Sequence, residues 1–286
     1  MSCLLPRFSI VVALLCVLYG CQSGPSMKPD GTFEVESDVS IEQTAPPYSD
    51  KEFLALVKKY TSDGGETVDY AAWKNSHEDM RRLDHHIELI AAVSPASQPG
   101  QFPNRSAERS YWINAYNALV LQAVLEYWPL ESVRDVKISL SSRLVPGKGF
   151  FYDREVIVGG ETTNLYNLEK EVLRNQKDPR LHFALNCASS SCPVLRPWEW
   201  TDEQLDQAAR EFVNDPDNVS VAGENVYLSR IFKWYRKDFP DEILVYLQQY
   251  AEPGLEEALQ QAAESRYRIR YDHYDWSLNK AVPADG

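Results

Sequence analysis

Residues 111–121 read Tyr111-Trp-Ile-Asn-Ala-Tyr-Asn-Ala-Leu-Val-Leu121 and are apolar almost all the way round a helix. A helix without a polar face has to be covered on every side, so this stretch predicts the central buried helix of a domain. We expect the helix to run from about Ser106 to Tyr127, because Trp128-Pro129 follows and proline does not continue a helix.

Two amides interrupt this apolar helix. Asn114 and Asn117 are three residues apart and therefore lie on neighbouring parts of one helical face. A buried amide costs about 1–3 kcal/mol unless its hydrogen bonds are made. Either the two asparagines tie the helix to the backbone of an adjacent loop or strand, or one of them lines a pocket and orients a substrate or an imidazole.

Shorter helices and strands are predicted on both sides of the central helix. Apolar residues at helical spacing predict helices near residues 49–60, 80–94 and 165–174, and one after Thr201; the first and last begin at the capping boxes Ser49/Glu52 and Thr201/Gln204. Apolar runs predict strands at residues 150–158, 181–185 and 266–271. Because these elements follow no regular βαβ rhythm, we expect an α+β fold, a single mixed domain with a central buried helix and a small sheet.

The first 20 residues predict a secretory signal. They hold one positive charge, Arg7, ahead of an apolar run that is too short to span a bilayer. Leu18-Tyr19-Gly20-Cys21 follows and resembles the lipobox of bacterial lipoproteins, in which the cysteine is lipidated after cleavage. We therefore expect a lipoprotein signal peptide at residues 1–20, a lipidated N-terminus and flexible tether at residues 21–47, and a globular domain at residues 48–286.

The anchor and the charge together predict a place in the cell envelope. Gln22 is not the aspartate associated with retention at the inner membrane, so we expect a lipid-anchored protein at the outer membrane that faces the periplasm. The membrane is then a partner through the lipid. The formal net charge of −13, which no basic run offsets locally, opposes binding to nucleic acid or to an anionic membrane through bulk electrostatics.

The stretch Asp178-Pro-Arg-Leu-His-Phe-Ala-Leu-Asn-Cys-Ala-Ser-Ser-Ser-Cys-Pro-Val-Leu-Arg196 combines residue types that are typical of a reactive site. In the strand predicted here, alternation places His182 and Asn186 on the same side, and Cys187 and Cys192 follow. Once the signal is removed, these two cysteines accompany only the lipidated Cys21, in a compartment where disulfides persist.

Three interpretations of the cysteine pair are open. The first is a disulfide between Cys187 and Cys192 that stiffens the turn. The second is a thiol nucleophile with His182 as its base. Cys187 lies at the strand end closest to His182, whereas Cys192 precedes Pro193, a residue favoured at helix N-termini, where a thiol pKa falls. The third is metal binding by the three residues, but their spacing is not a standard zinc pattern, so we predict no metal.

The C-terminal stretch Tyr271-Asp-His-Tyr-Asp-Trp-Ser-Leu-Asn279 supplies candidate partners for the imidazole. Asp272 or Asp275 is of the right residue type to orient His182, as the third member of a catalytic triad does. The alternative is that Asp275 caps a local turn and that Tyr274 helps to seal the core.

Other motifs are few. The aromatic segment from Ser229 to Phe239 is expected to pack as a strand or helix edge, with an ion pair between Arg230 and Asp238. No glycine-rich nucleotide loop, Gly-x-Ser-x-Gly elbow or His-Glu-x-x-His motif occurs in the sequence. We therefore predict no cofactor.

Four motifs in the same chain resemble the DUF547 family, and they span roughly residues 102–279: Tyr-Trp-Ile-Asn-Ala-Tyr-Asn-Ala-Leu, Asp-Pro-Arg-Leu-His-Phe-Ala-Leu-Asn-Cys-Ala-Ser-Ser-Ser-Cys-Pro, Leu-Ser-Arg-Ile-Phe-Lys-Trp-Tyr and Tyr-Asp-Trp-Ser-Leu-Asn. The resemblance is to a bacterial, lipoprotein-type member. It implies no settled activity, because bacterial members are often secreted proteins or lipoproteins and plant members, which carry a leucine-zipper region, are regarded as partner-binding proteins. Some plant relatives lack a cysteine at the place of Cys192, so the resemblance implies no obligatory role for it.

Two hypotheses about function follow. The favoured one is a lipid-anchored, non-catalytic envelope module that binds an envelope protein or a small-molecule ligand. The alternative is a hydrolase or acyl/amide transferase acting on envelope peptides or small amides. The candidate residues of that alternative are Cys187 or Cys192 as nucleophile, His182 as base, Asp272 or Asp275 as orienting group, and Asn114, Asn117 and Asn186 as substrate contacts.

Overall fold

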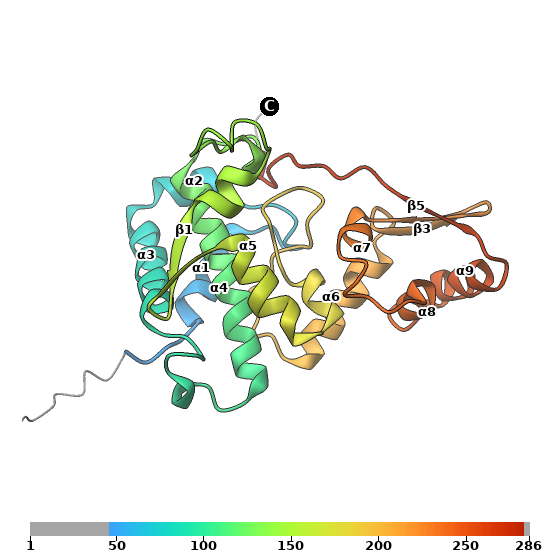
Figure 1. Cartoon of the computed structure of the whole chain (residues 1–286), viewed down its shortest axis with the longest axis horizontal. Coiled ribbons are helices and arrows are strands. Elements are labelled where there is room, and N and C mark those ends of the chain that lie inside the picture. Colours follow the sequence, from blue (N-terminus) through green and yellow to red (C-terminus); the bar gives the residue numbers. More distant parts are fainter. Residues whose placement is uncertain (1–45, 283–286) are drawn as a thin grey trace, which may run out of the picture. The chain divides into compact units, whose positions relative to one another are not determined.

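The computed structural model describes residues 46–282 (Figure 1). These residues belong to one compact unit, residues 45–286. The predicted signal peptide, the lipidation site Cys21 and nearly all of the predicted tether lie outside the described residues.

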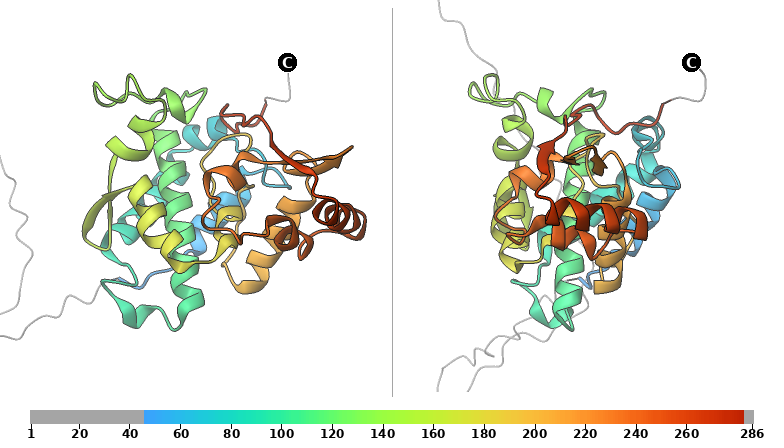
Figure 2. Two further views of the ribbon diagram at one scale, coloured as in Figure 1. Left: turned by 45° about the vertical axis from the view of Figure 1, so that its right-hand side comes forward. Right: turned by 90° about the vertical axis from the view of Figure 1, so that its right-hand side faces the viewer.

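Helix α4, Arg105–Glu126, is the predicted central buried helix. It starts at Asn104, whose side chain accepts a hydrogen bond from the Ala107 amide, and it ends ahead of Trp128-Pro129. Its residues from Ile113 to Leu121 are all buried, as its nearly uniform apolar sequence requires. Figures 1 and 2 show α4 running through the interior of the N-terminal half, with other helices on several sides.

The N-terminal helices α1 (Lys51–Tyr60), α2 (Tyr70–Asn75) and α3 (His77–Ala92) pack together and against α4. The predicted capping box at the start of α1 does not form. Asp50 is the N-cap residue and Ser49 accepts only a bond from the Lys51 amide, while Glu52 turns outward to pair with Arg82. Glu52 thus forms an exposed ion pair between α1 and α3 and takes no part in a capping box.

The middle of the chain mixes short elements. The strand predicted at residues 150–158 is only half present, because Gly149–Asp153 forms one π-helical turn and the strand β1 is Glu155–Val158. β1 pairs antiparallel with β2, Glu161–Asn164, through a turn at Gly159-Gly160, where both residues have positive φ. The predicted helix at residues 165–174 is present as α5 (Leu165–Asn167) followed by a π-helical segment, Leu168–Leu173.

The prediction of a strand at residues 181–185 is wrong. Residues Pro179–Phe183 form a short 3₁₀ helix whose N-cap, Asp178, accepts a hydrogen bond from the Arg180 amide. Proline in the first turn and an aspartate cap both favour a helical start, and five alternating residues are too few to outweigh them. His182 therefore belongs to a helical turn.

The C-terminal part carries the second sheet. Its strands are β3 (Val219–Ala222), β4 (Asn225–Leu228) and β5 (Arg268–Tyr271), with β3 antiparallel and β5 parallel to β4. The predicted helix after Thr201 is α6, Asp202–Asn214, and the Thr201 side chain caps it as expected. The remaining helices of this part are α7 (Arg230–Trp234), α8 (Ile243–Gln248) and α9 (Pro253–Glu264).

Two small sheets among many helices confirm the predicted α+β fold with a central buried helix. Within residues 46–282, no helix is both long enough and apolar enough to cross a membrane.

Asp79, in the first turn of α3, is the most heavily bonded carboxylate of the N-terminal helices. Its buried side chain accepts hydrogen bonds from Lys59 at 2.5 Å, Tyr60 at 2.7 Å and Arg82 at 2.7 Å. These donors, Lys59 first, hold the pKa of Asp79 well below its usual range. The carboxylate therefore joins α1 to α3.

We expect Asp79→Asn to lower the free energy of unfolding at neutral pH by about 2 kcal/mol, because the charge-assisted bonds are lost. Since the pKa of Asp79 is depressed on folding, its contribution is complete above the unfolded pKa of about 4 and is lost as the pH falls below it. Urea unfolding at pH values of about 7 and about 3 should therefore show a smaller difference between variant and wild type in acid.

The neighbouring Glu78→Gln is the matched control, because Glu78 is exposed in the same helical turn. A loss within about 0.5 kcal/mol is expected for it. Equal losses for both variants would contradict a specific role for Asp79.

Candidate functional site

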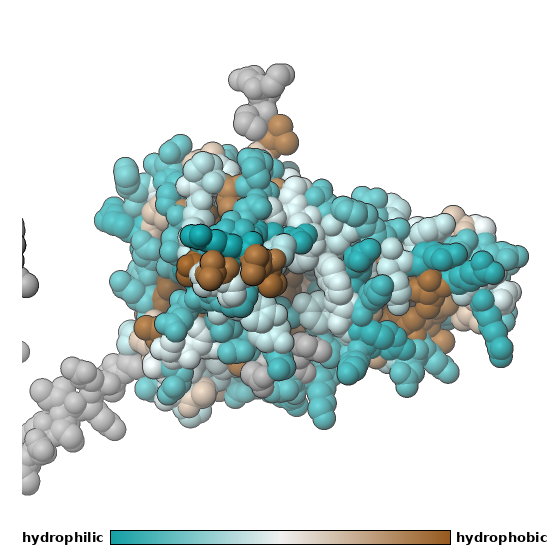
Figure 3. All heavy atoms as spheres, turned by 45° about the horizontal axis from the view of Figure 1, so that its top comes forward, coloured by the Kyte–Doolittle hydropathy of each residue, from teal (hydrophilic) through white to brown (hydrophobic). Residues whose placement is uncertain are grey.

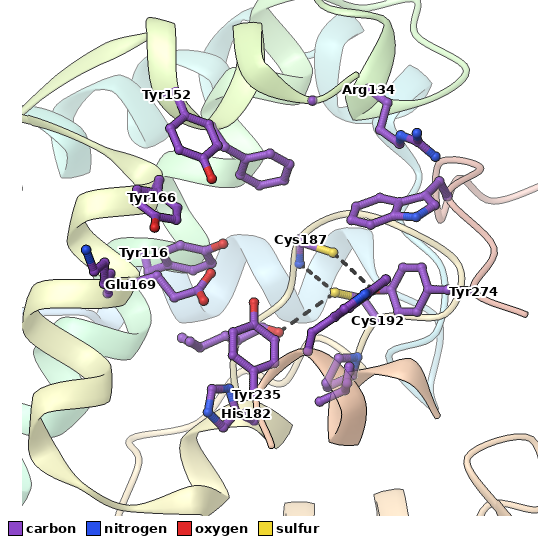
Figure 4. Close-up of a pocket in the computed structure, with 18 of the residues that line it drawn as sticks. Tyr116, Arg134, Tyr152, Tyr166, Glu169, His182, Cys187, Cys192, Tyr235 and Tyr274 are labelled. Atoms are coloured by element: carbon purple, nitrogen blue, oxygen red, sulfur yellow. Dashed lines mark hydrogen bonds between the residues drawn. The ribbon is translucent and has the colours of Figure 1, made fainter. Parts of the chain in front are cut away.

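A cavity of about 550 Å³ lies where several separate parts of the chain meet. Its wall includes the central helix, the segment before β1, the helix that follows β2, the turn at residues 184–193 (the cysteine turn), α7 and the C-terminal stretch. Figure 4 shows one tyrosine-rich wall facing Arg134 and Tyr274, with both cysteines between them. The residues that line it include Tyr116, Arg134, Tyr152, Tyr166, Glu169, His182, Cys187, Cys192, Trp234, Tyr235, Tyr274 and Trp276.

The cysteine turn is held to α4 by Asn117. The Asn117 side chain donates to the Ala184 carbonyl at 3.0 Å and accepts from the Asn186 amide at 2.9 Å. Both asparagines are buried. Asn117 thus ties the helix to adjacent backbone, which is the first of the two interpretations of its amide.

The Asn186 side chain stabilises the same turn through two hydrogen bonds within it. It accepts from the Ala188 amide at 2.8 Å and donates to the Pro193 carbonyl at 2.8 Å, so one amide spans the turn. Ala188 has a φ of 62°, a left-handed conformation that is uncommon for alanine and that brings the chain sharply round after Cys187. Asn186 holds the turn's shape and does not line the cavity.

Asn114 lies one helical turn away from this arrangement. Its side chain donates to Asp50 at 3.1 Å and to the Trp198 carbonyl at 3.2 Å, and it accepts from the Trp200 indole at 3.0 Å. Asn114 therefore fastens α4 to the segment that precedes α6. It is not among the described residues that line the cavity.

The C-terminal stretch holds the outer side of the turn. The Ser190 amide donates to the Ser277 carbonyl at 2.8 Å, the Ser191 amide to the Asp275 carbonyl at 3.3 Å, and the Asn279 amide to the Ala188 carbonyl at 3.1 Å. The cysteine turn is consequently hydrogen-bonded to the central helix α4 on one side and to the C-terminal stretch on the other.

The two carboxylates proposed as orienting groups lie elsewhere. The Asp275 carboxylate accepts from the backbone amide and the hydroxyl of Ser277, and these bonds lower its pKa. Asp272 uses its backbone carbonyl to accept from Arg230 at 3.0 Å. Among the hydrogen bonds of residues 46–282, none joins either carboxylate to His182.

His182 pairs instead with Asp238. The imidazole Nε2 lies 2.8 Å from the Asp238 carboxylate, and the ring stacks on Tyr235 with 4.2 Å between centroids. The predicted ion pair between Arg230 and Asp238 is therefore wrong, because the imidazole binds that carboxylate and Arg230 binds the Asp272 carbonyl. Sequence spacing gave no signal for this pair, since 56 residues separate its members.

The Cys187 sulfur lies within hydrogen-bond distance of two hydroxyls. It lies 3.1 Å from the Ser189 hydroxyl and 3.3 Å from the Tyr274 hydroxyl, and both cysteines are free thiols. A hydrogen bond from Cys192, followed by those from Ser189 and Tyr274, lowers the pKa of Cys187 to about 7 against the opposing effect of burial. A substantial thiolate fraction at neutral pH follows.

Cys192 has the opposite character. Burial, and then the hydrogen bond to Cys187, raise its pKa well above the usual value, so Cys192 keeps its proton and donates. Its Sγ also accepts from the Cys187 amide at 2.8 Å. The helix expected to begin at Pro193 is absent, because residues 193–200 are irregular and the next helix starts at Asp202. Cys192 therefore does not lie at a helix N-terminus.

His182 and the cysteines share the cavity wall without touching. Among the hydrogen bonds of the part of the chain that the structure describes, none joins the imidazole to either sulfur. Figure 4 shows the Tyr235 ring on the side of His182 that faces the cysteines. In residues 46–282, no cluster of three or more His, Cys, Asp or Glu side chains is arranged to hold a metal ion.

The groups that contact the Cys187 sulfur, Ser189 and Tyr274, are not predicted by the sequence. Tyr274 was expected only to seal the core, and Ser189 was one of three consecutive serines. The alternation of Tyr274 with Trp276 in a stretch without helical periodicity is the signal that would place both side chains on one face.

Residues 101–213 match the family model described as "Protein of unknown function, DUF547". The matched region includes α4, His182 and both cysteines, whereas Asp238 and Tyr274 lie beyond it. Neither a comparison with curated proteins nor one with solved structures finds a match for the chain.

Tyr274→Phe tests the donor arrangement around Cys187. The variant loses a hydroxyl that stabilises the thiolate, so the midpoint of the pH–rate curve for alkylation should move above 7. The rate at neutral pH should fall several-fold. Iodoacetamide labelling followed by peptide mass spectrometry measures both quantities for Cys187 and Cys192 separately.

Tyr271→Phe is the matched control, since Tyr271 lies three residues earlier and does not line the cavity. Its labelling curve should coincide with that of the wild type. Faster labelling of Cys192 than of Cys187 in the wild type would overturn the assignment of the two thiols.

Proposed function

We propose that this protein is a thiol-dependent hydrolase or acyl/amide transferase whose nucleophile is Cys187. One observation carries the proposal: the Cys187 sulfur opens into a cavity of about 550 Å³ and receives donors that lower its pKa to about 7. A structural thiol buried among apolar groups has a raised pKa and is inert.

The two cysteines have separate roles in this proposal. The Cys187 thiolate attacks the carbonyl carbon of an ester or amide, forming a thioester and expelling an alcohol or amine that takes up a proton. Water or a second amine then attacks the thioester and restores the thiolate. Cys192 remains protonated, and its sulfur accepts from the Cys187 amide at 2.8 Å, which holds the backbone that carries the nucleophile.

The His182–Asp238 pair supplies the proton chemistry from the cavity wall. Asp238 binds Nε2, which fixes the orientation of the imidazole in the way that a triad carboxylate does. The thiolate needs no base to form at neutral pH, so we assign His182 to later proton transfers. Substrate or a water molecule would bridge the imidazole and the reacting atoms.

The lining of the cavity favours a substrate with apolar or planar groups. Tyr152 and Tyr166 stack at 4.2 Å on one wall, and Arg134 lies over the Trp276 ring at 5.3 Å on the other. Aromatic faces bind rings and acyl chains, and the guanidinium attracts a carboxylate. Envelope peptides and small amides fit this description.

The place of action follows from the N-terminal sequence. The lipobox ending at Cys21 supports lipidation, and residues 22–47 would act as a tether. We propose that the domain works in the periplasm, anchored in the outer membrane. The acidic composition supports protein or small-molecule partners over nucleic acid.

A non-catalytic binding module is the second candidate. It is favoured by the absence, within residues 46–282, of a hydrogen bond between His182 and either sulfur. In this alternative the aromatic cavity captures a ligand or a peptide of an envelope partner, and oxidation of the cysteines to a disulfide would leave capture intact.

An acylation experiment separates the candidates. We expect the full chain incubated with p-nitrophenyl acetate to acquire one acetyl group on Cys187, at a rate that rises with pH through about 7 as the thiolate forms. Intact-protein and peptide mass spectrometry locate the adduct. Cys187→Ala should abolish the adduct at this position.

Cys192→Ala is the informative partner variant. It keeps the nucleophile but removes the hydrogen bond that lowers the pKa, so acylation should slow at neutral pH and recover in alkaline solution. An adduct that persists on other residues at an unchanged rate in Cys187→Ala would refute the nucleophile assignment. Saturable ligand binding by that variant, with no wild-type adduct, would establish the binding module instead.

A further inference from the structure

The loop between Val136 and Gly149 is built with polar residues inside and apolar residues outside. The Ser142 side chain is fully buried, whereas Leu140 is 77% exposed and Leu144 is 81% exposed. Ile138 and Val145 on the same loop are also about half exposed, at 47% and 52%. Loops in water are normally arranged the other way, because exposed leucine gains nothing from the solvent.

Several backbone amides of the loop donate to acceptors within the loop. The Ser142 hydroxyl accepts from the Ile138 amide at 2.9 Å and from the Ser139 amide at 2.8 Å. The Leu144 and Val145 amides both donate to the Ser141 carbonyl at 3.1 Å. Backbone that enters an apolar medium has to satisfy its polar groups in this way, since no water is available to do so.

The loop is also a basic island in an acidic chain. Residues 136–152 contain Lys137, Arg143 and Lys148 and no acidic residue, although the whole chain has a formal net charge of −13. Lys148 forms an ion pair with Asp153, while Lys137 and Arg143 are exposed beside the apolar side chains. These separate cations form no continuous basic run, but they make the loop a local exception to the acidic composition of the chain.

The loop stands at the top of the view in Figure 1 and projects from the surrounding elements in Figure 2. With that side turned forward, apolar side chains lie next to a row of strongly polar ones (Figure 3). Protruding aliphatic side chains flanked by lysine and arginine are typical of segments that enter the boundary between head groups and acyl chains.

We propose that the loop from Lys137 to Val145 docks on a lipid bilayer that contains anionic head groups. Ile138, Leu140, Leu144 and Val145 enter the acyl-chain boundary, and Lys137 and Arg143 contact phosphate groups. A lipid surface fits better than a protein partner, because exposed aliphatic side chains and exposed cations share one protruding loop, whereas lysine and most other charged residues are depleted at the core of a protein interface.

Docking would also turn the cavity toward the membrane. Pro146 and Gly147, which end the loop, line the cavity together with Arg134 from just before it. The ligand class then implied, an amphiphile that carries an acyl chain or a lipid-linked peptide, rests on the proposed function; the docking itself does not.

Vesicle co-flotation tests docking without the N-terminal lipid. The predicted mature chain without its lipid, residues 22–286 expressed without the signal peptide and Cys21, is mixed with phosphatidylcholine vesicles, with or without phosphatidylglycerol. We expect flotation with both vesicles and stronger flotation with phosphatidylglycerol, which added salt weakens. Leu140→Asp/Leu144→Asp should reduce binding at least about tenfold, because two inserted aliphatic side chains are lost.

Two further variants keep the result interpretable. Val245→Asp/Ile269→Asp changes two exposed apolar residues outside the loop and should float like its parent. Lys137→Gln/Arg143→Gln should remove the preference for phosphatidylglycerol.

Absence of flotation by the parent, or equal flotation of the leucine variant with an unchanged melting temperature, would overturn the proposal. Acylation of Cys187 in the leucine variant, measured in free solution, should be unchanged, so failure of docking is distinguishable from failure of the proposed function.

Discussion

The buried Asn117 amide is the interaction on which the site depends. It is the one side chain of the central helix that bonds both the carbonyl of Ala184 and the amide of Asn186, on the two sides of Leu185. An unsatisfied buried amide is costly, so the helix and the turn cannot slide past each other without losing both bonds. The position of the Cys187 sulfur relative to α4 is thereby fixed by one residue, and Tyr116, its neighbour in sequence, is brought to the cavity wall.

The asymmetry between the two thiols follows from this rigid turn. The Cys187 sulfur lies beside two hydroxyls, which are able to donate to a thiolate, whereas the Cys192 thiol donates to the backbone carbonyl of Leu185, which only accepts. Chemically identical side chains five residues apart thus acquire different pKa values because the turn presents them to different neighbours. Composition alone carries no such information.

The sequence predicts those features that depend on local pattern and misses those that depend on distant contacts. The uniform apolar stretch around Ile113 predicted the central helix, and Thr201 predicted the start of α6, because burial and capping act over a few residues. The prediction of a strand at residues 181–185 is wrong, because Asp178 and Pro179 start a helical turn there. The Asp238 partner of His182 could not be predicted, since the pair exists only once the turn after α7 and the 3₁₀ helix of His182 are packed together.

The clamp on the outer side of the cysteine turn comes from the last residues of the domain. Ser277 and Asn279 bond the turn directly, and Tyr274 supplies a donor to the sulfur. During synthesis, every residue of the central helix leaves the ribosome before this stretch does. Until the C-terminal stretch has packed against the turn, the Cys187 sulfur lacks the Tyr274 hydroxyl that helps to lower its pKa. The order of synthesis thus delays the special chemistry of this thiol until the domain around it is complete.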